Sequence, residues 1–103
     1  MADASRKRLD WTVRALEQLE TQFEYAVREQ LIDAEVLRGR IARTAGLIES
    51  HSGIGTPGRS RGTREWPIKG TPLTLIYRVR ASSVQILAVL HQRSNFARGR
   101  VPR

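Results

Sequence analysis

Two consecutive strand patterns in the C-terminal half constrain the fold of this chain more than any other feature. Residues 73–80 (LTLIYRVR) alternate between two sets of side chains, which is the two-residue period of a strand with two different faces. After a short turn at residues 81–83, residues 84–91 (VQILAVLH) are apolar on both faces, as in a strand inside a sheet. Because only a short turn joins them, we expect the two strands to pair antiparallel.

The residues before these strands predict a third strand and a long loop. Trp66 and Ile68 alternate with Glu65 over residues 63–68, and residues 69–72 (KGTP) have the composition of a turn. Residues 52–62 are rich in glycine and predict a loop. The three strands therefore predict an antiparallel meander.

The N-terminal half predicts a short strand followed by two helices. Leu9 and Trp11 alternate with charged residues, and Thr12 is the expected N-cap of the helix that follows. Apolar residues then recur every three or four positions over residues 13–27 and again over residues 34–48, with a break near Gln30 and Leu31. We expect an antiparallel helical hairpin whose apolar stripes pack against the C-terminal half. The stripe of the first helix consists of Val13, Leu16, Leu19, Phe23 and Val27.

These patterns together predict an α+β fold, in which an N-terminal helical hairpin packs on a small twisted antiparallel β-sheet. With 103 residues, the chain is expected to form a single domain over residues 1–103, with residues 97–103 as a basic C-terminal tail. Gly39 lies inside the second helix pattern, where glycine costs about 1 kcal/mol relative to alanine.

The charge of the chain is concentrated in its C-terminal half. The net charge is +8, and residues 50–103 hold ten Lys or Arg residues against the single acid Glu65. Residues 1–49 are nearly neutral, with eight basic and nine acidic residues. Such an asymmetry predicts a polyanion or an acidic protein as a partner.

Several classes of function are excluded by what the sequence does not contain. No apolar run approaches the roughly 18 residues of a membrane span, and the N-terminus has no apolar segment of the kind found in signal peptides. The chain has no cysteine, so we expect a protein of the reducing cytoplasm. Its two histidines and dispersed acids predict no metal site, and it carries no phosphate-binding GxxxxGK[ST] loop and no nucleophilic triad. We expect neither a metal nor a cofactor.

The remaining candidates are cations and one imidazole, namely Arg59, Arg61, Arg64, Arg78, Arg80, His91 and Arg93. Guanidinium groups make bidentate contacts with phosphate, and a histidine among them could act as a general acid or base in RNA cleavage. A histidine that ends an apolar strand is more often a hydrogen-bonding residue, so both interpretations of His91 stay open. Tyr77, Trp66 and Phe96 are expected to pack in the core or at its edges.

Three segments in this order and spacing are specific enough to indicate a family. Residues 55–65 (GTPGRSRGTRE), 76–79 (IYRV) and 86–96 (ILAVLHQRSNF), preceded by residues 11–19 (WTVRALEQL), resemble the RelE/ParE superfamily of bacterial toxins. The resemblance covers residues 9–96. It implies the α+β fold predicted above and a toxin of a type II toxin–antitoxin pair, which a small antitoxin neutralises by forming a hetero-oligomer.

The resemblance implies one of two activities. RelE-like members cleave messenger RNA on the ribosome with basic residues and Tyr or His, which would make His91 and Arg93 the catalytic residues here. ParE-like members poison DNA gyrase without catalysis, and Arg59, Arg61, Arg64, Arg78, Arg80 and Arg93 would then serve in binding the target. Thr74 stands where many RNA-cleaving relatives carry an arginine, and the GTRE element is also more like the ParE branch. The sequence therefore favours a ParE-like gyrase inhibitor, with RNA cleavage and a non-toxic nucleic-acid-binding module as the alternatives.

Overall fold

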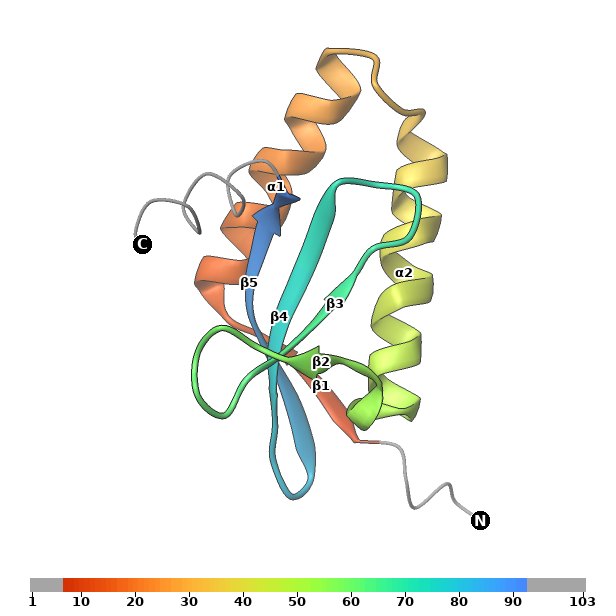
Figure 1. Cartoon of the computed structure of the whole chain (residues 1–103). Coiled ribbons are helices and arrows are strands. Elements are labelled where there is room, and N and C mark those ends of the chain that lie inside the picture. Colours follow the sequence, from red (N-terminus) through yellow and green to blue (C-terminus); the bar gives the residue numbers. More distant parts are fainter. Residues whose placement is uncertain (1–6, 93–103) are drawn as a thin grey trace.

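The computed structural model describes residues 7–92 of this protein. Two helices are followed by a hairpin-rich sheet, as the sequence predicts (Figure 1). A single 3₁₀ turn at Ser52–Ile54 follows the second helix. In chain order the elements are β1 (Arg8–Trp11), α1 (Val13–Arg28), α2 (Ala34–Ser50), β2 (Thr56–Pro57), β3 (Arg64–Pro67), β4 (Leu73–Val79) and β5 (Ser83–His91).

The five strands form one sheet in the order β1-β5-β4-β3-β2. The pairs β2–β3, β3–β4 and β4–β5 are antiparallel, which confirms the predicted meander and the α+β class. β1 pairs with β5 in parallel, so the sheet is mixed rather than wholly antiparallel. The two helices that separate β1 from the meander provide the long crossover that a parallel pair requires. The short β2 lies within the segment predicted to be loop, and it pairs with the N-terminal half of β3.

A bulge in β5 changes which of its side chains face the helices. Tyr77 of β4 pairs with Ile86, whereas the preceding Ile76 pairs with Ala88, so Leu87 is the extra residue. Val84 and Ile86 before the bulge and Val89 after it all belong to the core cluster. The interior position predicted for β5 is confirmed, since it pairs with β1 on one side and with β4 on the other.

The helix boundaries agree with the predicted signals. Thr12 accepts a hydrogen bond from the Ala15 amide at 3.0 Å through its side chain and caps α1. Asp33 caps α2 in the same way through the amides of Glu35 and Val36. The predicted break lies at Gln30, whose φ of 57° takes the chain out of helical geometry.

The face of α1 that packs on the sheet differs from the predicted apolar stripe. Val13 and Leu16 are 71% and 49% exposed, while Ala15 is fully buried. The small side chain of Ala15 lets the helix lie close to β5, and Gln18 accepts a hydrogen bond from the Val89 amide at 2.8 Å. Because β1 ends at Trp11 and pairs only as far as Ile86, this amide has no strand partner on that side, and α1 turns Gln18 toward it.

The core lies between the helices and the strands β3, β4 and β5. Both helices lie on one side of the sheet, joined at one end by the short link around Gln30 (Figure 1). Tyr77 is fully buried in this core and Trp66 packs against it, which confirms both expectations, whereas Phe96 lies outside the described residues. The predicted basic tail also lies outside the described range. No helix within residues 7–92 is long and apolar enough to cross a membrane.

Candidate functional site

Tyr77 and Arg64 hold the glycine-rich loop onto the sheet. The Tyr77 hydroxyl donates to the carbonyl of Ser52 and accepts from the Gly55 amide, both at 2.8 Å. Burial raises the pKa of Tyr77, an effect that the Gly55 amide and the charge of Arg64 partly oppose. Gly55 has to be a glycine here, because an added Cβ would lie 2.5 Å from the Tyr77 hydroxyl. The phenol is therefore part of the fold.

Arg64 takes part in the same structure. It pairs with Tyr77 across β3 and β4, so its side chain lies on the helix-covered face. Its guanidinium donates to the Gly55 carbonyl at 2.6 Å and to the Gly53 carbonyl at 3.4 Å. These two bonds to neutral carbonyls, both from Nη1, fix the loop to the sheet.

Arg59 is engaged by the one acid of the C-terminal half. Its guanidinium forms a two-pronged contact with Glu65, with nitrogen–oxygen distances of 2.7 and 3.0 Å, and its amide adds a bond of 2.9 Å. The hydrogen bonds between Arg59 and Glu65 lower the pKa of Glu65 below its usual value. They also raise the pKa of the Arg59 guanidinium above its usual value. Glu65 pairs with Ile76 in the register, so this ion pair lies on the opposite face of the sheet from Arg64.

Three of the predicted cations make no ion pair or side-chain hydrogen bond with other described residues. Arg61 is exposed in the loop between β2 and β3, and Arg78 is half-buried in β4 opposite Gln85. Arg80 belongs with Arg78 to the alternating pattern of residues 73–80, but it follows the end of β4, and its amide donates to the Ser83 carbonyl in the turn. This turn projects from the end of the sheet opposite the link between the helices (Figure 1).

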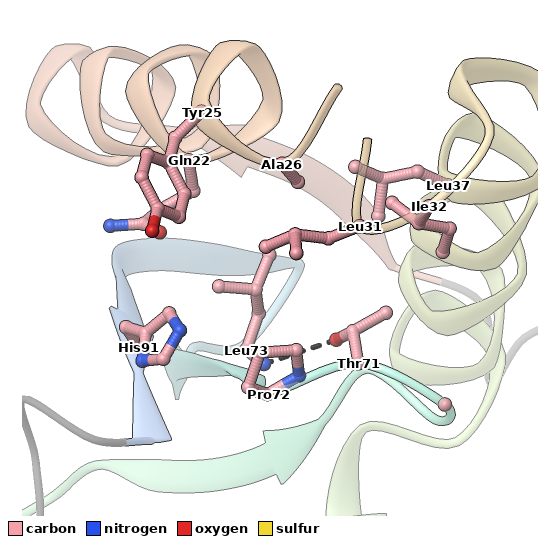
Figure 2. Close-up of a pocket in the computed structure, with 11 residues that line it drawn as sticks. Gln22, Tyr25, Ala26, Leu31, Ile32, Leu37, Thr71, Pro72, Leu73 and His91 are labelled. Carbon is pink, nitrogen blue, oxygen red and sulfur yellow. Dashed lines mark hydrogen bonds between the residues drawn. The ribbon is translucent and has the colours of Figure 1, made fainter. Parts of the chain in front are cut away.

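His91 ends β5 and lines an apolar pocket. It pairs with Leu73, whose buried side chain belongs to the core, so the imidazole lies on the helix-covered face. Figure 2 shows His91 below Gln22 and Tyr25 of α1, with leucine and isoleucine side chains of the helix link farther along the pocket. The cavity measures about 90 Å³. Arg93, its predicted catalytic companion, lies outside the described residues.

The predicted residues do not converge on one point. Arg64 pairs with Tyr77 and His91 pairs with Leu73, four residues apart along β4, which corresponds to roughly 13 Å of strand. The buried Leu75 lies between them on that face. Thr74, where RNA-cleaving relatives carry an arginine, pairs with Leu90 and faces the opposite side of the sheet from His91. Within residues 7–92 no group of three His, Cys, Asp or Glu residues could hold a metal ion.

Two further surfaces were not singled out in the sequence. The first, which we call the hairpin groove, lies between α1 and α2 and is lined by Leu16, Leu19, Glu20, Phe23, Glu24, Arg38 and Ile41. The guanidinium of Arg38 lies 5.1 Å from the centre of the Phe23 ring and covers part of it. The second, which we call the cationic hollow, lies beside α2 and contains Arg40, Arg43 and Lys69. The three-residue spacing of Arg40 and Arg43 was the one available signal for the hollow.

Comparison with known proteins identifies the class of protein to which this fold belongs. A family model described as the ParE toxin of type II toxin–antitoxin systems, parDE, matches residues 9–96. The chain is 33% identical over 87 residues to Y4kP of Sinorhizobium fredii (strain NBRC 101917 / NGR234), a protein named as a candidate toxin. That match covers 84% of this chain and 90% of Y4kP.

Solved structures show the same fold. A chain of the chromosomal ParDE toxin–antitoxin system from P. aeruginosa superposes with a TM-score of 0.72 at 20% identity, over 84% of this chain and 97% of that chain. YafQ from E. coli strain BL21(DE3) superposes with a TM-score of 0.60 at 12% identity, over 88% of this chain and 99% of that chain. Fold and sequence define a type II toxin of the RelE/ParE superfamily. Within it, this chain belongs to the ParE toxin family.

Proposed function

We propose that this toxin acts by inhibiting DNA gyrase as a binding protein without catalysis of its own. The observation that carries the proposal is the engagement of Arg59, Arg64 and Tyr77 within the chain's own fold. A nuclease needs a proton-transfer group and a cation within hydrogen-bond reach of one phosphate. Among the described residues, Arg59 binds Glu65 instead, and Arg64 and Tyr77 bind carbonyls of the glycine-rich loop.

We also propose that a cognate antitoxin neutralises the chain by forming a hetero-oligomer with it. The hairpin groove supports this proposal because it leaves apolar side chains of α1 open to solvent, and a toxin of a toxin–antitoxin pair has a partner that can cover them. An amphipathic helix with apolar residues at three- and four-residue spacing would cover this groove. Glu20 and Glu24 lie on the α1 side of the groove and Arg38 lies on the α2 side. This arrangement of charges would fix the direction of such a helix.

The cations that have no partner among the described residues are the expected contacts with the target. Arg61, Arg78 and Arg80 lie on loops and strands outside the core and make no ion pair with other described residues. Charges of this kind accelerate association with an acidic or nucleic-acid-bound partner. Replacing all three with glutamine is expected to weaken inhibition and to leave the fold unchanged.

RNA cleavage on the ribosome is the second candidate, and the position of His91 favours it. The imidazole lines a pocket next to the hydroxyl-bearing Tyr25 and the amide of Gln22, which could orient a nucleotide. The proposal for gyrase and the proposal for RNA differ in what they require of His91. In the first it is structural, and in the second it transfers a proton.

A gyrase assay with the purified chain, freed of antitoxin, tests the proposal. We expect inhibition of plasmid supercoiling and trapping of cleaved DNA at micromolar concentration, reversed by antitoxin. His91→Gln should inhibit as the wild type does, with His51→Gln at the exposed end of α2 as the matched control. The proposal would be rejected if the chain left gyrase unaffected and instead cleaved RNA on the ribosome. In that case His91→Gln should abolish cleavage and His51→Gln should retain it.

A further inference from the structure

The cationic hollow brings together three cations from two parts of the chain. Arg40 and Arg43 come from α2, and Lys69 comes from the turn between β3 and β4, which reaches across to the helix (Figure 1). The hollow measures about 440 Å³ and is open to solvent. It is separate from the pocket of His91 and from the hairpin groove, which have other linings.

The fold holds one of these cations in position. The Arg40 guanidinium donates to the Lys69 carbonyl at 3.1 Å, which ties α2 to the turn. Gly70 makes this contact possible, because it adopts a φ of +80° and a Cβ at that position would overlap the Arg40 guanidinium. Only one guanidinium nitrogen is used in this bond, so Arg40 keeps further N–H donors for a ligand.

Among the described residues, no carboxylate forms an ion pair with a cation of the hollow. Glu35 is the one acid in its lining, and it forms an ion pair with Arg38 at 2.8 Å. Within residues 7–92, Arg43 and Lys69 make no ion pair. Like charges that gather without a counter-charge repel one another, and a bound anion would relieve that repulsion.

Gly39 opens the helix surface at the same place. It lies in the interior of α2, where glycine weakens a helix relative to alanine, and it lines the hollow. Apart from its two chain neighbours and the nearby backbone of α2, no atom of residues 7–92 lies within 4 Å of a Cβ built on it, so packing among these residues does not require a glycine. A glycine at such a position permits a ligand to approach the helix backbone more closely than any other residue would.

We infer that the cationic hollow binds the phosphate backbone of a nucleic-acid duplex. Several cations arranged around a shallow surface match consecutive phosphates, which are contacted through charge and need no apolar anchor. A peptide would need such an anchor, and Val36 is the one large apolar side chain in the lining of the hollow. The overall charge of +8 would draw the chain toward the same ligand.

Fluorescence anisotropy with a labelled duplex of about 20 base pairs, titrated from low to high salt without gyrase, tests this inference. The logarithm of the affinity should fall with the logarithm of salt by about 0.9 for each phosphate contact. Arg43→Gln should reduce that slope by about 1, and Arg43→Gln with Lys69→Gln by about 2, with a 10- to 100-fold loss of affinity at 0.1 M salt. Arg14→Gln, an exposed arginine of α1 that lies outside the hollow, is the matched control.

Gly39→Ala tests the close approach of the ligand to the helix without changing any charge. The variant should melt at a higher temperature than the wild type, because alanine favours the helix, yet bind the duplex several-fold more weakly. Binding equal to wild type in Gly39→Ala would overturn the close approach to the helix. A double variant whose slope matches that of Arg14→Gln, or polyglutamate that competes as well as DNA at equal charge, would overturn the site itself.

Discussion

Replacing Tyr77 with phenylalanine removes one oxygen atom from the centre of the fold and tests how the glycine-rich loop is held. The ring itself is fully buried and would keep its packing against the core. The hydroxyl makes two hydrogen bonds to the loop, to the Ser52 carbonyl and from the Gly55 amide. The substitution therefore leaves both loop groups without their partner.

The expected cost follows from the burial of those two groups. Gly55 is buried, so its orphaned amide should cost about 1–3 kcal/mol, whereas Ser52 is half-buried and its carbonyl should cost about 0.5–1 kcal/mol because water can reach it. The free energy of unfolding should thus fall by about 1.5–4 kcal/mol. For a chain of this length, that corresponds to a melting temperature lower by roughly 7–18 °C.

Urea unfolding followed by far-ultraviolet circular dichroism measures this change, with Tyr25→Phe as the matched control. Tyr25 is 45% exposed, and its replacement should alter the free energy of unfolding by less than about 0.5 kcal/mol. Equal midpoints for the two variants would refute the conclusion that the Tyr77 hydroxyl holds the loop. A lower slope with denaturant in Tyr77→Phe alone would show that the loop is released in the native state.

The same variant predicts a change in the pH dependence of stability. Because burial raises the pKa of Tyr77 above its ordinary value of 10.0, the folded protein holds the phenolic proton more tightly than the unfolded chain does. This contribution is complete below pH 10 and is lost as the pH rises through the folded-state pKa. The wild type should therefore lose stability more steeply than Tyr77→Phe above pH 10, and parallel curves would contradict the assignment.

Two further substitutions probe the ion pair and the turn. Glu65→Gln should lower the free energy of unfolding by about 1 kcal/mol at pH 7, because the two-pronged contact with Arg59 is only partly exposed. Since that contact lowers the pKa of Glu65, the difference in stability between the two proteins should vanish as the pH falls through the folded-state pKa. Acid titration of both proteins measures this, and a difference that persists at low pH would contradict the role of the ion pair. Gly70→Ala should cost about 1–2 kcal/mol or more, because its φ is +80° and a Cβ would overlap the Arg40 guanidinium. Gly46→Ala, in open space within α2, should instead stabilise the chain by about 1 kcal/mol, and thermal melts of the two glycine variants measure both effects.

The elements of the fold could be predicted because each carries a local signal. Thr12 caps α1, the three- and four-residue spacing marks both helices, and the alternation over residues 73–80 marks β4. Short turns between strands then leave an antiparallel meander as the natural arrangement, and the structure confirms it. These signals act over a few residues, so the sequence displays them directly.

The candidate site could not be predicted to the same degree, because its residues meet only through pairing and packing. Arg59 and Arg64 are predicted to bind a target, yet each has a partner in the fold whose position depends on the register of β3. The cationic hollow was missed since Lys69 reaches α2 only once the turn after β3 is in place. The role of Arg93 stays a prediction, as it lies outside the described residues.

The sequence by itself determined both helices, the strands other than β2, the α+β class and the resemblance to RelE/ParE toxins, since periodicity, caps and motif spacing are properties of neighbouring residues. Only the tertiary structure decided the parallel pairing of β1 with β5 and the exposure of Val13 and Leu16. It also decided the face of His91, because a single bulge at Leu87 exchanges the faces of every residue that follows it in the strand. The alternation of residues within one strand does not show where an extra residue is inserted, because a bulge is defined only by the pairing with the neighbouring strand.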